Sequence, residues 1–156
     1  MSVPVDIRRP LVSFMLQYAR TQPEHTAVVG TDRAVTYGEL WDFIAGYARY
    51  LTGQGFKPGD KAVVQPSPTA AYVVTFFAIH LSRGVFVPVE KDLPDALIGE
   101  IAENVGAKWV IVNREFHLNG AVSLPFDIFG SAAPFIQSEL DEPLWPLPEE
   151  IGRAHV

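Results

Sequence analysis

The sequence predicts an α/β fold with a mainly parallel sheet, helices on both faces, and an N-terminal helix and β-hairpin before the sheet. Two observations predict it. Lys61–Gln65 and Lys108–Val112 are short, nearly continuous apolar runs without polar alternation, which is typical of strands buried on both faces of a parallel sheet. Segments with helical spacing separate such runs, and this alternation indicates strand–helix–strand units.

The N-terminal helix is predicted from apolar residues that recur at helical spacing: Leu11, Phe14, Met15, Tyr18 and Ala19. Pro10 suits a first helical position, and Thr21-Gln22-Pro23 ends the run. Two short runs, Thr26–Val29 and Ala34–Thr36, then flank Gly30-Thr31-Asp32-Arg33. This arrangement predicts a β-hairpin.

The next helix begins at a capping box, Thr36-Tyr37-Gly38-Glu39. The Thr36 hydroxyl can accept a hydrogen bond from the Glu39 N–H, and the Glu39 side chain can reach back. The apolar face of this helix consists of Leu40, Phe43, Ile44, Tyr47, Ala48 and Leu51. Gly53 or Gly55 can supply the left-handed residue at its end, and Pro58 prevents continuation.

The helix after the first sheet strand is predicted to start with Ser67 as its N-cap and Pro68 in its first turn. It runs to about Arg83 and is apolar nearly all round, so it is expected to be packed on several sides. Gly84 is expected to end it, before a strand over Val85–Val89.

A further helix opens at Asp92-Leu93-Pro94 and closes at Gly106. The residues predicted to point inward are Leu97, Ile98, Ile101 and Val105. Asp92 and Asp95 flank the helix start, where capping and compensation of the helix dipole explain them better than catalysis.

The periodic pattern weakens after Asn113. Ala121–Leu124 is a candidate short strand after the turn signal Asn119-Gly120. Glu139–Glu150 is acidic and is broken by three prolines, so it is predicted to be a surface linker or an extended segment.

Composition excludes several classes of protein. The net charge is −6 and no block of Lys or Arg occurs, which argues against nucleic acid or an anionic membrane as partner. The absence of cysteine excludes disulfides, thiolate zinc sites and cysteine nucleophiles. The most apolar run, Ala70–Ile79, is too short to span a bilayer, and the N-terminus lacks a signal-peptide pattern. We therefore expect a cytoplasmic protein.

No catalytic, cofactor-binding or metal-binding residue is assigned from the residue patterns. Gly53-x-Gly55 follows a helix rather than a strand, so the dinucleotide-binding context fails. The four histidines are scattered, and His80 fits a packed residue better than a ligand. Tyr72, Phe76 and Phe77 are candidates to line an acyl pocket, but a helix that is apolar on several faces favours a role in the core. No Gly-x-Ser-x-Gly elbow is present.

Four motifs in order carry a resemblance to a known family: Thr36–Leu40, Gly55–Asp60, Gly84–Pro88 and Gly106-Ala107-Lys108. Their order and spacing resemble the start of the adenylate-forming enzymes, which include acyl-CoA synthetases, aryl-acid ligases and peptide-synthetase adenylation domains. The resemblance covers roughly Pro10–Val112. One departure is Val85, where the family often has Ala. The resemblance implies that the chain is an incomplete subdomain of a larger ligase domain.

The family's reaction has two steps. A carboxylate attacks the α-phosphorus of ATP to give an acyl-adenylate and pyrophosphate, and a thiol of CoA or of a carrier protein then takes the acyl group. The resemblance therefore implies that the parent protein binds a carboxylic acid, ATP, Mg²⁺ and one of these thiols.

In relatives, a Ser/Thr/Gly-rich loop ending in Lys grips the phosphates soon after the position of Leu147–Glu150. Nothing in this sequence matches that loop, so no catalytic or cofactor-binding residue is carried over. We predict that the 156 residues alone lack ligase activity. The alternative is a complete small α/β module for ligand binding or interaction, which would use the crevice at the carboxyl ends of its strands.

The last six residues have a separate explanation. Ile151-Gly152-Arg153-Ala154-His155-Val156 can be encoded by ATC-GGA-AGA-GCA-CAC-GTC, a part of a common sequencing adapter whose next codon in this frame is a stop. We expect residues 1–150 to be the N-terminal fragment of an AMP-binding ligase domain and residues 151–156 to be a non-native, adapter-derived tail.

The genomic DNA downstream of the Glu150 codon tests this expectation. We expect the native gene to encode a Ser/Thr/Gly-rich loop ending in Lys there. A genomic sequence that continues through the codons of residues 151–156 would contradict the adapter origin. A genomic stop codon after Glu150 would favour the small module.

Overall fold

The structure is a computed structural model that describes residues 10–112, 122–125 and 129. The described elements run in this order: α1 (Pro10–Thr21), β1 (Thr26–Val29), β2 (Ala34–Thr36), α2 (Tyr37–Gly53), β3 (Lys61–Val64), α3 (Ala70–Leu81), β4 (Val85–Pro88), α4 (Asp95–Val105), β5 (Trp109–Val112) and β6 (Val122–Pro125).

The strands form two sheets. β1 and β2 pair as an antiparallel hairpin, and the other four strands form a parallel sheet in the order β4-β3-β5-β6. β6 lies next to β5 in parallel, so the candidate strand predicted over Ala121–Leu124 is confirmed with a shift of one residue. The predicted α/β class and the parallel sheet are confirmed. The predicted linker over Glu139–Glu150 lies outside the described residues.

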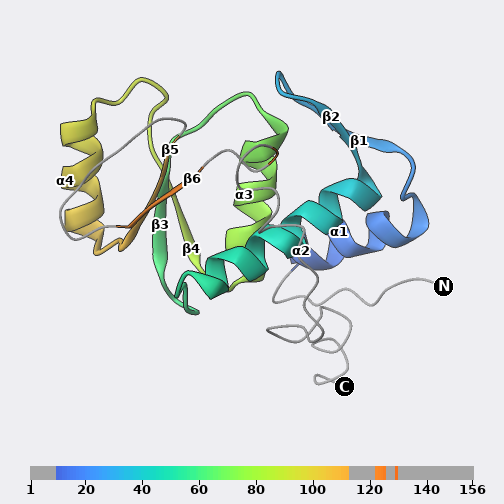
Figure 1. Cartoon of the computed structure of the whole chain (residues 1–156), viewed down its shortest axis with the longest axis horizontal. Coiled ribbons are helices and arrows are strands. Elements are labelled where there is room, and N and C mark those ends of the chain that lie inside the picture. The colour runs from blue at the N-terminus through green and yellow to red at the C-terminus, as the bar shows by residue number, and fades with distance from the viewer. Residues whose placement is uncertain (1–9, 113–121, 126–128, 130–156) are drawn as a thin grey trace.

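Helices cover both faces of the parallel sheet. Figure 1 shows α4 on one side of the sheet and α2 and α3 on the other, with α1 beyond α2. Neighbouring residues of one strand therefore enter different cores. Val64 packs in the larger core with α2 and α3, whereas Val63 packs in the smaller core with Ile98 and Ala102 of α4. All four residues of β5 are buried, which explains its unbroken apolar sequence.

β4 lies at one edge of the described sheet. The Val85 N–H donates to the Asp60 carbonyl and the Val89 N–H donates to the Val64 carbonyl, so the odd-numbered residues bond to β3. Pro88 lies between them and faces the open edge, where a missing N–H costs no hydrogen bond of the sheet.

α2 forms as its sequence predicts. All six residues of its predicted apolar face are buried. Both hydrogen bonds of the capping box are present: Thr36 N–H to Glu39 Oε1 at 2.9 Å, and Glu39 N–H to Thr36 Oγ1 at 3.2 Å. Of the two glycines proposed to end the helix, Gly55 has the left-handed conformation, with φ of 106°. Gly53 is the last helical residue.

The predicted start of α3 is wrong, and its last residue, Leu81, comes two residues before the predicted end near Arg83. The helix begins at Ala70 with Thr69 as its N-cap, and Ser67 and Pro68 precede it. The reason is tertiary, because the hairpin turn supplies hydrogen-bond acceptors to the first helical N–H groups. At the other end, Arg83 rather than Gly84 takes the left-handed conformation, with φ of 59°.

Gly84 is required by packing and not by its φ angle. A Cβ atom at this position would lie 2.4 Å from Phe56 Cζ and 3.1 Å from the Asp60 carbonyl oxygen. The Phe56 ring is itself buried and lies 5.5 Å from the Trp109 ring, between ring centroids. Residue 84 is therefore glycine because its backbone lies too close to the buried Phe56 ring for a side chain to fit.

α4 also departs from its prediction. Leu97 was expected to point inward but is 44% exposed, whereas Ile98 is fully buried. Gly99 and Ala102 are buried beside Ile98. These small residues bring the helix backbone close to the sheet, so the buried face is narrower than the apolar spacing predicts. The N-cap residue is Pro94 rather than Asp92 and makes no side-chain capping hydrogen bond, and Gly106 closes the helix with φ of 72°, as predicted.

Gly84→Ala is expected to destabilise the fold by about 1–3 kcal/mol, because a methyl group would overlap the buried Phe56 ring. Urea unfolding followed by tryptophan fluorescence measures the change. Gly53→Ala is the matched control, since nothing lies within 4 Å of the added Cβ and the residue is helical. It is expected to stabilise by up to about 1 kcal/mol. Equal effects of the two variants would contradict the packing explanation.

Candidate functional site

The candidate site lies at the carboxyl edge of the parallel sheet. The chain leaves β3 through α3 and forms β4 on one side of β3. It then returns through α4 and forms β5 on the other side of β3. α3 and α4 cover opposite faces, as Figure 1 shows. The strand order therefore reverses between β3 and β5. Open α/β sheets bind ligands outside the carboxyl ends of their strands at such a point.

Gln65, the first residue after β3, ties this edge together. It is only 6% exposed. Its backbone N–H donates to the Ile111 carbonyl of β5 at 3.1 Å. Its side-chain amide donates to the Lys91 carbonyl at 2.8 Å, and the Leu93 carbonyl lies further away at 3.4 Å. Gln65 thus fixes the loop between β4 and α4 against the ends of β3 and β5.

The turn of the β1–β2 hairpin fixes the loop between β3 and α3. The backbone N–H and the hydroxyl of Thr31 both donate to the Pro68 carbonyl, at 2.9 and 3.1 Å. Gly30 lies so close to the start of α3 that an added Cβ would be 2.3 Å from the Ala70 nitrogen. The hairpin turn and the start of α3 are therefore in direct backbone contact.

Asp32 caps α3 from the hairpin turn. Its Oδ1 accepts from the Ala70 N–H at 2.7 Å and its Oδ2 accepts from the Ala71 N–H at 3.1 Å. Oδ1 also accepts from the Arg33 N–H at 2.8 Å. Partial burial acts to raise the pKa of Asp32, but these backbone donors outweigh it and hold the pKa below its ordinary value. The carboxylate also lies at the positive end of the helix dipole.

The N-terminus of α3 is closed to a phosphate group. Asp32 accepts from the Ala70 and Ala71 N–H groups, and the Thr69 hydroxyl accepts from the Tyr72 N–H at 3.1 Å. A helix N-terminus binds phosphate through such N–H groups, and here side chains occupy them. Among the described residues, no group of three or more His, Cys, Asp or Glu side chains is placed to hold a metal ion. The N-terminus of α3 therefore has no free N–H groups to offer the ATP phosphates.

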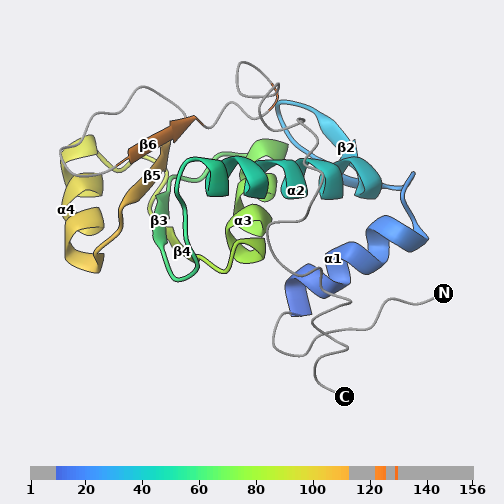
Figure 2. The ribbon, with the colours of Figure 1, turned by 60° about the horizontal axis from the view of Figure 1, so that its bottom comes forward.

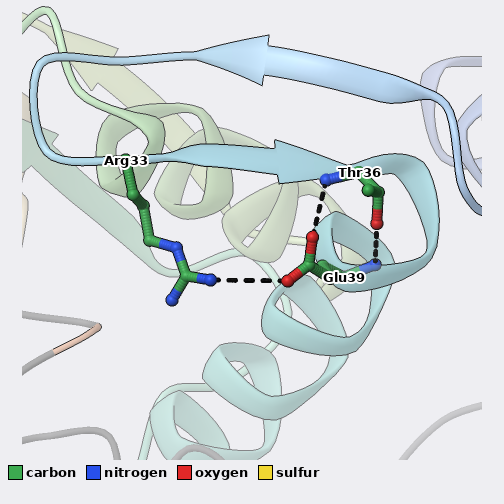
Figure 3. A network of polar contacts seen from close by, with 3 residues as sticks. All are labelled: Arg33, Thr36 and Glu39. Carbon is green, nitrogen blue, oxygen red and sulfur yellow. Dashed lines mark hydrogen bonds and ion pairs between the residues drawn. The ribbon is translucent and has the colours of Figure 1, made fainter.

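The other end of the hairpin is joined to α2, as Figure 3 shows. Arg33 reaches Glu39 Oε2 at 3.4 Å while the capping box occupies the other carboxylate oxygen. The Thr36 N–H, with help from its hydroxyl and from Arg33, lowers the pKa of Glu39. The Arg33 guanidinium also lies over two aromatic rings, 5.4 Å from the centroid of Phe43 and 4.9 Å from that of Phe129.

The aromatic residues considered for an acyl pocket pack against one another. The Phe76 ring lies 5.1 Å from Phe86 of β4, 5.3 Å from Phe77 and 4.5 Å from His80, between ring centroids. Tyr72 lies 5.9 Å from Phe86. These contacts support the interpretation of the aromatic residues and of His80 as packed residues between α3 and β4. They are spread along α3, from Tyr72 in its first turn to His80 in its last.

Asp32 and Gln65 are the residues that sequence reasoning missed. Asp32 was treated only as part of a turn, and Asp is common in turns for local reasons. Gln65 was treated as the end of a strand. No signal in the sequence marks the contact of Asp32 with Ala70, 38 residues later. Gln65 is marked only as a polar residue between a buried strand and a proline.

A family model described as AMP-binding enzyme matches residues 16–142. Coprinoferrin synthetase from Coprinopsis cinerea is 30% identical over 149 residues, which cover 86% of this chain and 6% of that protein. Phosphinothricin tripeptide synthetase PhsC from Streptomyces viridochromogenes is 27% identical over 143 residues, which cover 89% of this chain and 13% of that protein. The chain thus spans a small part of these curated relatives.

Solved structures share the fold. The N-terminal subdomain of Klebsiella oxytoca NpsA, in complex with 3-hydroxybenzoyl-AMSN, matches with a TM-score of 0.72 at 19% identity over 88% of this chain and 34% of that one. O-succinylbenzoate coenzyme A synthetase (MenE) from Bacillus subtilis, in complex with AMP, matches with a TM-score of 0.68 at 20% identity over 83% of this chain and 33% of that one.

Fold and sequence together define the class of protein. The chain is the N-terminal part of an adenylate-forming enzyme, with the architecture of the N-terminal subdomain of adenylation domains. It belongs to the AMP-binding enzyme family. The resemblance drawn from the four ordered motifs is confirmed. None of the helices in the described part of the chain has the length and hydropathy needed to cross a membrane.

Asp32→Ala is expected to destabilise the fold by about 0.5–2 kcal/mol, the usual cost of losing an N-cap acceptor. Because the folded-state pKa of Asp32 is lowered, its contribution is present above the unfolded pKa of about 3.9 and is lost as the pH falls through the lowered value. Lowering the pH should therefore destabilise the Asp32→Ala variant less than it destabilises the unsubstituted protein. Urea unfolding between about pH 7 and pH 2.5 measures both effects.

Asp42→Ala is the matched control, because the pKa of Asp42 is shifted in the opposite direction. Partial burial raises it, with Arg49 opposing the shift and Glu39 adding to it. Removal of this carboxylate is expected to leave stability at pH 7 unchanged or higher. A loss at pH 7 as large as that of Asp32→Ala would show that the capping contacts of Asp32 are not the cause.

Proposed function

We propose that this chain is the N-terminal scaffold of an AMP-forming acid–thiol ligase. The whole enzyme activates a carboxylic acid with ATP to an acyl-adenylate and then transfers the acyl group to a thiol. The family match over residues 16–142 carries the proposal. The similarity to the N-terminal subdomain of NpsA supports it at the level of the fold.

A carrier-protein thiol is the favoured acceptor. The relatives at 27–31% identity include proteins named as peptide synthetases, among them nonribosomal peptide synthetase GRA1 from Gibberella zeae, at 31% identity over 66% of this chain. CoA is the second candidate, because the fold is also similar to that of the coenzyme A synthetase MenE. An amino or aryl acid is the corresponding class of substrate.

The role of the chain within the enzyme is to support the site and not to perform the chemistry. At the described carboxyl edge, Asp32, Thr69 and Gln65 make hydrogen bonds to the protein backbone. ATP and Mg²⁺, when bound to the whole enzyme, supply the leaving pyrophosphate and the charge stabilisation for its departure. We assign both to residues outside this chain, and we propose that residues 1–150 are the native part, in a cytoplasmic enzyme.

An ATP–pyrophosphate exchange assay tests the proposal on two proteins. The 156-residue chain is expected to give no exchange with a panel of amino and aryl acids. The domain extended along its native gene is expected to exchange with at least one acid. Exchange by the short chain would refute its inactivity. Lack of exchange by the extended, folded domain with every acid, despite ATP binding, would refute ligase function.

The acceptor is distinguished by mass spectrometry on the extended domain. With the activated acid and ATP present, a mass increase on a phosphopantetheinylated carrier protein is expected, and acyl-CoA is not. Formation of acyl-CoA alone would assign the enzyme to the CoA ligases and would leave the adenylation step of the proposal intact.

A further inference from the structure

α1 exposes an apolar stripe on the side away from the core. Leu11, Phe14 and Tyr18 are 47%, 48% and 43% exposed. They recur at steps of three and four residues, so they lie on one face of the helix. The opposite face is already buried, with Val12 and Leu16 each 3% exposed. The helix is therefore apolar on a second face that the described residues leave open.

The stripe is held in a fixed position. The ring of Tyr18 stacks on that of Tyr37 at the start of α2, with centroids 5.2 Å apart and planes 23° apart. The Tyr18 carbonyl accepts from the Gln22 N–H at 2.8 Å. Figure 2 shows α1 at the outside of the molecule, further from the parallel sheet than α2. A fixed surface with two aromatic side chains suits a proline-rich partner, because such a partner loses little entropy on binding.

A segment near the end of the chain has matching chemistry. Residues 140–147 read Leu-Asp-Glu-Pro-Leu-Trp-Pro-Leu and lie outside the described residues. Four of these eight side chains are large and apolar. Pro143, Pro146 and Pro148 bar both a helix and a central strand. The apolar side chains of this segment can thus be covered only by a surface that another element supplies.

The length of chain allows the segment to reach α1. Phe129 is described, and its ring lies 4.7 Å from that of Phe43 on α2, the helix against which α1 packs. Leu140 is eleven residue steps beyond Phe129, and eleven steps span up to about 36–40 Å when extended. α1 has 12 residues and is about 18 Å long. The segment can therefore lie along the whole stripe.

We propose that the stripe formed by Leu11, Phe14 and Tyr18 is the docking surface for residues 140–147 of the same chain. The apolar side chains of the segment cover the stripe, and its acidic residues Glu139, Asp141 and Glu142 stay in water. Docking would fix the path of the chain as it leaves this subdomain. The inference does not rest on the proposed function, and it concerns residues before the suspected tail at 151–156.

Paramagnetic broadening tests the proposal, and the lack of cysteine makes labelling specific. Glu142→Cys carries a nitroxide in the full ¹⁵N-labelled chain. The amide signals of α1 are expected to weaken severalfold relative to the reduced label, while those of α4 keep their intensity. A second sample mixes the ¹⁵N-labelled chain without nitroxide and the unlabelled chain with nitroxide. No weakening of α1 signals is expected there.

Each other outcome overturns the proposal. Weakening of α1 signals in the mixed sample would show that a second copy covers the stripe. Full intensity of the α1 signals in both samples would show that residues 140–147 do not dock there. Phe14→Ser in the labelled chain is expected to restore the α1 signals, and Leu11→Ser serves if that variant unfolds. Leu97→Ser is the matched control: it is equally exposed but lies on α4, so broadening should persist.

Discussion

The burial of β3 and β5 on both faces is the constraint on which the rest of the structure depends. Residues of these central strands alternate between two cores, so each face needs a cover of helices. α2 and α3 cover one face and α4 covers the other. The chain can supply both covers only by crossing the sheet on opposite sides in successive connections. That crossing creates the reversal of strand order at the carboxyl edge.

The second level of organisation joins the hairpin to this sheet. The hairpin is not part of the parallel sheet. Its turn nevertheless caps α3 through Asp32 and contacts Pro68 through Thr31. On its other side Arg33 reaches the capped start of α2. One short turn thus connects the starts of two helices that pack together, and it positions the loop that leaves the central strand.

Local chemistry explains how much of the fold can be predicted from the sequence. The capping box at Thr36, the buried face of α2 and the glycine at 106 depend on residues a few positions apart, so the sequence specifies them. The start of α3 depends on Asp32, 38 residues before Ala70, and sequence spacing carries no trace of such a contact. The same holds for Gln65, whose partners lie 25–28 residues along the chain. That this chain carries no catalytic, cofactor-binding or metal-binding residue remains a prediction.

Pro88 has a consequence for the architecture of any larger protein that contains this sheet. An incoming strand alongside β4 would meet a position that offers no hydrogen-bond donor, at the edge that Pro88 faces. β6 forms the other margin of the described sheet. One hydrogen-bond donor is therefore missing along the β4 margin, which disfavours pairing there with a further strand or with another molecule.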